Sequence, residues 1–165
     1  MGGRGGRGRD GDHHRAVAVA LVKKDRRRRA REAALQILYQ WDVGRGDVNR
    51  AVETFFGHQW PDAQPAPDEV RTFASGLARD TVARLDAIDA VVAETAQNWR
   101  PERMAVLDRL ILRMAVCEMM RDPDTPPAVV INEALELART FSTEDAVKFI
   151  NGMLDAIRKK LGTRS

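Results

Sequence analysis

Arginines crowd residues 26–31 of this chain and fill five of the six positions: Arg26, Arg27, Arg28, Arg29 and Arg31. A guanidinium stays charged at physiological pH, and its planar fork of donors matches the oxygens of a phosphate group. The cluster is therefore either a phosphate-binding surface or a run of solvated charge, because many blocks of like charge have no specific partner. The remainder of the sequence has to separate these two interpretations.

Basic residues are concentrated at one end of the chain. Of 165 residues, the first 31 hold eleven Arg or Lys against three Asp, whereas the other 134 hold 16 basic and 21 acidic side chains. The net charge of +3 thus combines a cationic N-terminal part with a mildly acidic remainder. This asymmetry favours an anionic partner, such as nucleic acid, at the N-terminal part.

Residue types suited to catalysis are few. His13 and His14 lie in a stretch rich in glycine and arginine, and His58 has no second metal ligand within sequence reach. Glu133 and Glu136 stand three apart and could act as paired carboxylates, but glutamates on a helix surface commonly have this spacing. We expect no enzyme, no cofactor and no metal site, which leaves a binding module.

The single cysteine, Cys117, helps to indicate the cellular compartment of the protein. One thiol excludes an internal disulfide and is too few for structural zinc, and its apolar neighbours indicate a buried side chain. The longest apolar run, 16–22, has seven residues, far fewer than the ~20 of a membrane span. Basic residues rather than a cleavage site follow this run. We expect a cytoplasmic protein that does not contact the membrane.

A helix has to position the arginines. The apolar residues of this stretch recur with helical spacing at Ala30, Ala34, Ile37, Leu38 and Trp41. Asp25 can cap this helix at its N-terminus, and Gly44 can end it. The arginines would then occupy the first turn, where the helix dipole disfavours them and an anionic ligand would relieve the conflict.

The first 22 residues are predicted to be a disordered tail rich in glycine and arginine, and residues 23–165 a helical domain. Residues 1–15 contain six glycines and no large apolar side chain apart from Met1, so nothing would offset the entropy of ordering them. Gly-Arg repeats occur in flexible RNA-binding tails, but a solvated extension gives the same pattern. Residues 16–22 either extend the first helix or lie on the surface.

Helical periodicity continues through the rest of the chain, and no segment alternates with the period of a strand. Further helices are predicted at about 47–59, from 68 onwards with a break near 85–87, and at 104–121, 128–140 and 144–160. Asp47 can cap the first of these, and Ser-Thr-Glu-Asp at 142–145 matches a capping box for the last. The helix 104–121 is apolar on two sides and should be central. The predicted fold is all-α, with about seven helices in a single domain.

A second basic patch is predicted in the last helix. Lys148 precedes Phe149 near the start of that helix, and Phe149 lies at the edge of its apolar stripe. An aromatic ring there can stack on an unpaired base while the lysine meets a phosphate, or it can be a residue at the core boundary. The basic end at 158–160 is a further candidate contact.

Four motifs, in order along the chain, resemble the NusB family of bacterial transcription antitermination factors. They read RRRAREAALQILYQW at 27–41, DRLILRMAVCE at 108–118, PAVVINEALELA at 127–138 and KFINGML at 148–154. The resemblance runs from about residue 25 to residue 161 and leaves out residues 1–22. It implies two three-helix bundles plus an extra helix.

The resemblance also implies partners. It implies binding of the boxA element of leader and ribosomal RNA transcripts together with the ribosomal protein NusE, in a complex on RNA polymerase that suppresses termination. Carried over by motif, the RNA contacts would come from Arg27, Arg28, Arg29, Arg31, Lys148, Phe149 and Asn151. Tyr39 and Asp108 would lie on the NusE side. Cys117 stands where the family often has an aromatic residue, which bears on packing.

Two other interpretations stay open. A NusB-like domain also precedes the catalytic domain of some ribosomal RNA cytosine methyltransferases, although this chain shows no nucleotide loop or strand-rich region for a methyl donor. The chain could also be a helical adaptor that binds only proteins, with its arginines solvated. Self-association as a homodimer, which could cover the arginines, is not decided by the sequence.

Overall fold

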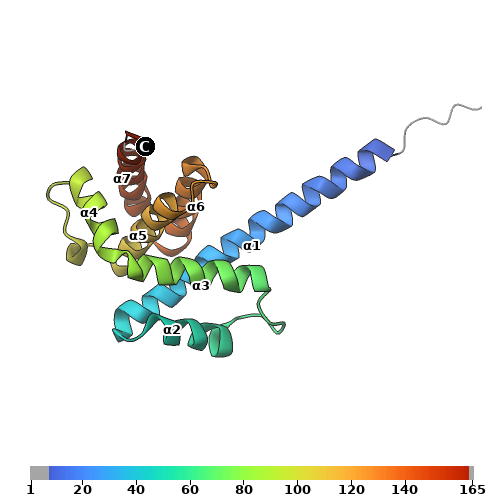
Figure 1. The fold of residues 1–165 in the computed structure, drawn as a ribbon, viewed down its shortest axis with the longest axis horizontal. Helices are drawn as coiled ribbons and strands as arrows, with labels where there is room; N and C mark the ends of the chain where they lie inside the picture. Colours follow the sequence, from blue (N-terminus) through green and yellow to red (C-terminus); the bar gives the residue numbers. More distant parts are fainter. Residues whose placement is uncertain (1–7, 164–165) are drawn as a thin grey trace, which may run out of the picture.

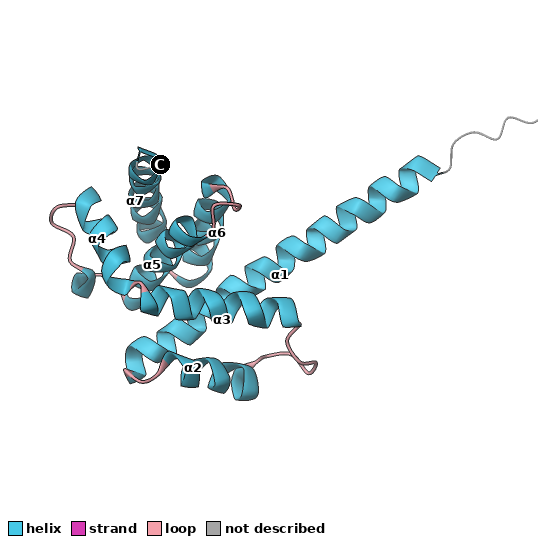
Figure 2. Cartoon of the chain, viewed as in Figure 1, coloured by secondary structure: helices cyan, strands magenta, loops and turns pink. Residues whose placement is uncertain are grey.

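Helix α1, Gly8–Gly44, is the longest element, and its N-terminal half projects from the body that the other helices form (Figure 1). The computed structural model describes residues 8–163. Within that range every regular element is helical and no strand occurs (Figure 2). The seven α-helices confirm the predicted fold class. No helix among these residues is long and apolar enough to cross a membrane.

The predicted start of the first helix is wrong. Asp25 lies in the middle of α1 instead of capping it, so the arginines do not occupy a first turn and do not face the positive end of a helix dipole. No glycine or proline interrupts residues 12–43, and Ala, Leu, Lys and Arg in this stretch favour helix. Extending an existing helix costs much less than nucleating a new one, so α1 continues past Asp25.

Only part of the segment 1–22, which was predicted to be disordered, can be compared with the structure. Residues 1–7 lie outside the described residues, whereas residues 8–22 continue α1 as helix. Of the two alternatives for 16–22, the structure therefore shows the helical extension. Val17, Val19 and Leu21 in this stretch are exposed, so the segment is helical without belonging to the core.

The C-terminal half of α1 packs as predicted. Ala30, Ala34, Ile37 and Leu38 are buried, and Trp41 packs against the core from its edge. The helix ends at Gly44, but the left-handed conformation falls on Arg45, which has φ of 51°. The amide of Arg45 donates to the carbonyl oxygen of Trp41 over 2.8 Å, which satisfies one of the free carbonyls at the helix end.

The first bundle combines α1 with α2, Val48–Thr54, and α3, Asp68–Ala83. Asp47 caps α2 as predicted, since its Oδ1 accepts from the amide of Asn49 at 2.9 Å. One wider turn of π-helix, η1 (Phe55–Gln59), follows α2 and leads into the proline-rich loop 60–67. This loop carries the chain to the start of α3, beside α1.

The second bundle contains α5, Val106–Arg121, α6, Pro127–Phe141, and α7, Glu144–Thr163. The fourth helix, α4 (Leu85–Thr95), is separated from α3 by Arg84, close to the predicted break, and packs on α5 and α7. A short 3₁₀ turn, η2 (Pro101–Arg103), precedes α5. The two bundles meet where α5 contacts α1 and α3, so α5 is the central helix, as its two-sided apolar pattern predicted.

Caps at the junctions explain where the last two helices begin. Pro127 occupies the first turn of α6, as predicted. The N-terminus of α7 is capped by Thr143, whose Oγ1 accepts from the amide of Ala146 at 3.1 Å. Ser142 does not form the predicted capping box, because its hydroxyl donates to the carboxylate of Asp108 in α5.

Cys117 lies on α5 and is fully buried, as expected of a small apolar side chain. Burial raises the pKa of its thiol, so it stays protonated at neutral pH.

Candidate nucleic-acid interface

The arginines of α1 point in different directions because successive residues of a helix are rotated by about 100°. Arg27 and Arg29 turn toward α3 and the loop 60–67, while Arg28 and Arg31 turn toward the second bundle. The cluster therefore spans the line where the two bundles meet.

Arg27 and Arg29 are each stacked on an aromatic ring. The guanidinium carbon of Arg27 lies 4.2 Å from the centre of the Phe73 ring in α3, and that of Arg29 lies 4.7 Å from the Trp60 ring. Arg29 also pairs with Asp62 in the same loop. Stacking fixes the plane of a guanidinium while its edge keeps its donors.

Trp60 is itself held in place. Its ring packs edge-on against buried Phe55, with the ring centres 6.2 Å apart, and its Nε1–H donates to the carbonyl oxygen of Gln64 at 3.1 Å. The loop 60–67, although irregular, thus presents a fixed aromatic surface to Arg29.

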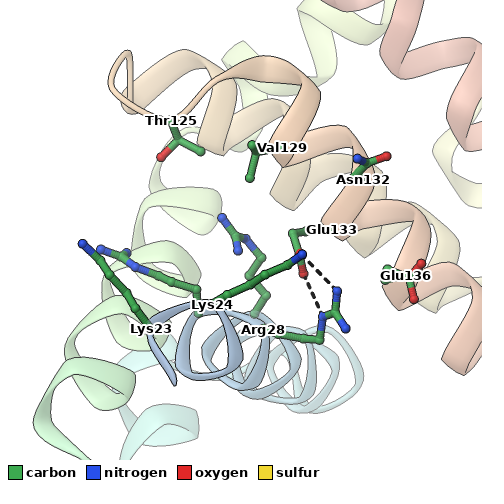
Figure 3. A pocket seen from close by; sticks show the side chains of 10 residues that line it. Lys23, Lys24, Arg28, Thr125, Val129, Asn132, Glu133 and Glu136 are labelled. Carbon is green, nitrogen blue, oxygen red and sulfur yellow. Dashed lines mark hydrogen bonds and ion pairs between the residues drawn. The ribbon is translucent and has the colours of Figure 1, made fainter. Parts of the chain in front are cut away.

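Arg28 reaches across to α6. Its Nε and Nη2 donate to the two carboxylate oxygens of Glu133 at 3.2 and 3.3 Å (Figure 3). The Glu133 side chain is buried, whereas that of Arg28 is 40% exposed. Hydrogen bonding to Glu133 raises the pKa of Arg28. The exposed edge of Arg28 remains accessible from solvent.

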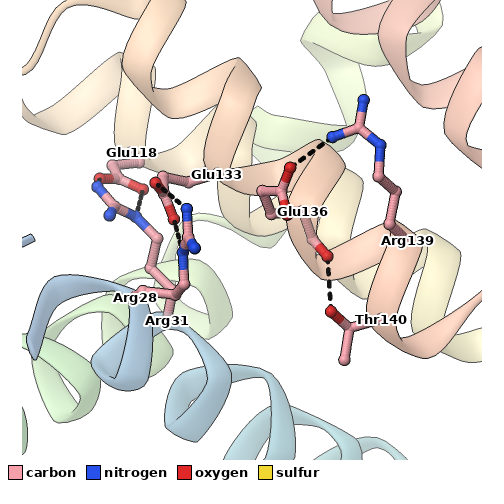
Figure 4. A network of polar contacts seen from close by, with 7 residues as sticks. All are labelled: Arg28, Arg31, Glu118, Glu133, Glu136, Arg139 and Thr140. Atoms are coloured by element: carbon pink, nitrogen blue, oxygen red, sulfur yellow. Dashed lines mark hydrogen bonds and ion pairs between the residues drawn. The ribbon is translucent and has the colours of Figure 1, made fainter. Parts of the chain in front are cut away.

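Arg31 belongs to the interior. Only 6% of it is exposed, and its guanidinium pairs with Glu118 of α5, which is 2% exposed (Figure 4). The Nε of Arg31 donates to Glu118 Oε2 at 3.1 Å. This geometry does not support the predicted RNA contact of Arg31, because its donors are directed at a buried carboxylate. The pair instead joins α1 to α5.

A cleft of about 720 Å³ opens between α1 and α6 beside these pairs (Figure 3). The α1 side carries only basic residues, and the α6 side carries polar, acidic and apolar ones. Its lining consists of Lys23, Lys24, Arg27, Arg28, Arg31, Thr125, Val129, Asn132, Glu133 and Glu136.

The second basic patch is exposed on α7. Phe149 is 47% exposed, and Lys148 and Asn151 beside it are also exposed. Phe149 therefore does not lie in the buried core, and part of its ring is accessible from solvent. No hydrogen bond or ion pair within residues 8–163 joins this patch to the arginines of α1.

Tyr39 and Asp108 lie on neighbouring elements. Tyr39, near the end of α1, is 44% exposed, and its hydroxyl has no hydrogen-bond partner in the described part of the chain. The ion pair between Asp42 and Arg109, 3.2 Å long, joins this end of α1 to the first turn of α5, which contains Asp108. Asp108 is half-buried and accepts from Ser142 at the junction of α6 and α7.

A family model described as the NusB family matches residues 28–159. The chain belongs to the NusB family. Both the resemblance and the predicted fold are thereby confirmed, since the matched range includes α2 to α6 completely, the C-terminal half of α1, and α7 apart from its last turn.

Individual NusB proteins agree with this assignment. A transcription antitermination protein NusB of Koribacter versatilis is 44% identical over 140 residues, which cover 85% of this chain and 93% of that protein. A solved NusB structure from T. maritima superposes with a TM-score of 0.72 at 32% identity and covers 81% of this chain and 90% of that one. A chain in a crystal structure of NusB and NusE with double-stranded RNA has the same fold, with a TM-score of 0.71 at 24% identity, covering 82% and 98%.

NusB proteins are transcription antitermination factors, so the comparisons confirm the prediction of a role other than catalysis. They also favour this family over the methyltransferase interpretation, because the curated relative aligns with this chain over nearly its whole length.

Several residues of the interface had no clear signal in the sequence. Phe73, Trp60 and Asp62 fix two of the arginines but lie 31 or more positions away from the residues they contact. Lys23 and Lys24 line the cleft, although the sequence suggested that the helix begins only after them. A helical extension through 16–22, which was one of the open alternatives, would have placed these lysines one turn before the arginines.

Proposed function

We propose that this NusB-family chain binds boxA-type single-stranded RNA through Arg27, Arg28 and Arg29. The observation that carries the proposal is the stacking of Arg27 on Phe73 and of Arg29 on Trp60, which fixes the planes of two guanidiniums. Arginines fixed in this way lose little conformational entropy when they meet phosphates, so the surface is suited to an RNA backbone.

The patch on α7 supplies the features needed to recognise bases. Phe149 offers an exposed ring on which an unpaired base can stack, Lys148 offers a charge for phosphate, and Asn151 offers an amide. In this proposal the arginines position the RNA and the α7 patch holds unpaired bases.

The second partner in the proposal is the ribosomal protein NusE, which would bind at the surface of Tyr39 and Asp108. An exposed tyrosine whose hydroxyl is unpaired is a typical interface anchor. A protein of the same fold occurs in a crystal structure with NusE and RNA, which supports the choice of partner. The resulting complex would join RNA polymerase and suppress termination in ribosomal RNA operons.

Filter binding at one fixed salt concentration tests the proposal. The full chain should retain a boxA-type single-stranded RNA at least ten times more tightly than a scrambled RNA of the same length and composition. Equal retention of the two RNAs would leave only non-specific attraction of charges. No binding of either RNA would favour the adaptor interpretation, in which the arginines are solvated.

A further inference from the structure

We propose that the cleft between α1 and α6 holds one nucleotide of the bound RNA, with its phosphate against α1 and its base against α6. The base would carry an exocyclic amino group. This inference rests on the proposed RNA binding and goes further, because it assigns a pocket for one base and names what recognises it.

The two walls of the cleft are matching helix faces. Lys24, Arg27, Arg28 and Arg31 follow the spacing of one face of α1, and Val129, Asn132, Glu133 and Glu136 follow the same spacing on α6. All eight residues line the cleft, and Figure 3 shows Arg28 of α1 meeting Glu133 of α6 across it. The hydrogen bonds between Arg28 and Glu133 join the two walls.

The α1 wall is free to receive a phosphate. Lys23 and Lys24 are exposed and make no ion pair or hydrogen bond with the described residues. Arg27 is stacked on Phe73 but pairs with no carboxylate in the same part of the chain. Three cations that have no counter-ion among the described residues therefore line one side of the cleft, which is electrostatically unfavourable until an anion binds.

The α6 wall has the chemistry of a base-binding surface. Val129 is 44% exposed and offers an apolar surface for the flat face of a base. Asn132, one turn further along, is exposed, and its amide has no partner within residues 8–163. An asparagine amide can pair with the edge of a base, donating to a ring nitrogen and accepting from an amino group.

The acidic residues of this wall favour bases with an amino group. Glu136 lies one turn beyond Asn132, with one carboxylate oxygen engaged by Arg139 at 2.6 Å (Figure 4). Carboxylates accept from the amino groups of cytosine or adenine and repel a carbonyl edge such as that of uracil. The cleft is thus cationic on its α1 side and carries carboxylates on its α6 side. A nucleotide with an amino-bearing base has the matching arrangement, with an anionic phosphate at one end and amino hydrogens at the other.

The size of the cleft is appropriate. Pockets that enclose ligands of small-molecule size measure roughly 300–1,000 Å³, and this cleft measures about 720 Å³. Lys23 and Lys24 also precede residue 28, where the match to the family model starts. Part of the proposed nucleotide site is therefore built by residues outside the matched range.

The test is a double-mutant cycle between the protein and the RNA. Each nucleotide of a boxA-type RNA is replaced in turn by an abasic residue, and the Kd of every RNA is measured for the wild-type full chain and for Asn132→Ala. At one position the abasic RNA should bind the wild type at least tenfold more weakly. At that position the loss should fall to less than threefold with Asn132→Ala, because the pocket no longer distinguishes the base.

Two further variants examine the separate walls. Lys23→Gln combined with Lys24→Gln should weaken binding of all these RNAs by a similar factor of about ten and leave the abasic pattern unchanged. Arg50→Gln combined with Arg103→Gln removes two exposed charges elsewhere and should change Kd less than threefold. Asn98→Ala is the matched control for Asn132→Ala, because Asn98 is also exposed but lies between α4 and η2 and does not line the cleft.

The outcomes distinguish this inference from the proposed function. If the wild type binds boxA-type RNA specifically but no abasic position is coupled to Asn132, the pocket is refuted and the RNA-binding proposal stands. If the coupled base can be replaced by uracil without loss, the assignment of an amino-bearing base is wrong. If the wild type shows no preference for boxA-type RNA, both proposals fail together.

Discussion

Single arginines of α1 have different physical roles although they are neighbours in the sequence. Arg27 and Arg29 are stacked on aromatic rings, Arg28 is half-exposed and paired with Glu133, and Arg31 is buried against Glu118. A buried pair of this kind is expensive to break, because removing one partner leaves an uncompensated charge worth roughly 3–5 kcal/mol. Substitution at Arg31 would therefore report on folding, whereas substitution at Arg27 would report on binding.

Phe149→Ala tests the assignment of the exposed ring. Stacking on a base would make the substitution cost roughly 1–3 kcal/mol of RNA affinity. Because the side chain is 47% exposed, the variant should lose much less stability than the roughly 3–5 kcal/mol typical of a core phenylalanine. RNA titration and thermal melting of the same variant measure both quantities. A variant that melts much earlier yet binds RNA normally once folded would contradict the assignment.

Asp122 should give a pH-dependent contribution to stability. Its carboxylate accepts from the Thr125 hydroxyl at 2.6 Å and from the amides of Asp124 and Thr125, and the Thr125 hydrogen bond lowers the pKa of Asp122. A lowered pKa means that the contribution is complete above the unfolded value of about 3.9 and is lost as pH falls through the folded value.

The expected result is that Asp122→Ala lowers the free energy of unfolding by about 1 kcal/mol at pH 7. The difference from wild type should shrink as pH falls below about 4, because the wild-type carboxylate becomes protonated. Urea unfolding at a series of pH values measures this difference in the free energy of unfolding. Asp124→Ala is the control, because the Asp124 side chain accepts none of these hydrogen bonds. A difference that stays constant with pH would exclude the charge as its cause.

At the scale of elements, α1 is the scaffold of the proposed binding surface, because its C-terminal half contacts α2 and α3 of the first bundle and α5 of the second. The arginines lie along its middle, and their partners come from α3, the loop 60–67, α5 and α6. The geometry of the candidate interface thus depends on how the two bundles are joined.

Replacing Arg27, Arg28 and Arg29 together by Ala should weaken RNA binding by several kcal/mol at low salt, since three fixed charges are lost. The slope of log Kd against log salt should fall by about 0.7 for each phosphate contact removed from single-stranded RNA. Deleting residues 1–22 should have a smaller effect, because Lys23, Lys24 and the arginines remain. A deletion more damaging than the triple substitution would place the main RNA contacts in the N-terminal segment.

The elements were largely predictable from sequence, and the contacts between them were not. Local spacing located the stripe of α1, the Asp47 cap and the interruption between α3 and α4, because these features depend on residues a few positions apart. The start of α1 was missed because Asp25 resembles a cap locally, although nothing in residues 12–24 breaks a helix. The stacking of Arg27 on Phe73 and the pairing of Arg31 with Glu118 depend on the tertiary arrangement, which no local pattern encodes.

At the scale of the whole molecule, the proposed RNA and NusE surfaces share α1. Tyr39 lies about two turns beyond Arg31 on this helix, and the Asp42–Arg109 pair links its end to the start of α5. One long RNA could therefore contact the chain and NusE at the same time, which would make the binding of either partner strengthen the binding of the other.

Saturating NusE should raise RNA affinity by a coupling of about 1–3 kcal/mol, and RNA must raise NusE affinity by the same factor. Tyr39→Ala should remove this coupling and leave RNA binding by the isolated chain nearly unchanged, since it leaves the arginines intact. Titrations at one salt concentration, with and without NusE, measure the effect. Equal RNA affinity in both series would indicate two independent sites.

The projecting half of α1 has a consequence for local stability. Amides of residues 30–38 lie in a stretch with buried side chains on several sides, whereas the side chains described between residues 11 and 26 are exposed. Backbone hydrogen bonds in the second stretch can open without disturbing the core, so their amides should exchange with deuterium orders of magnitude faster than those of the first. One continuous helix thus contains a slow-exchanging and a fast-exchanging segment, and the boundary between them falls at the arginines. The proposed RNA-binding residues stand where the helix passes from folding cooperatively with the core to fraying independently of it.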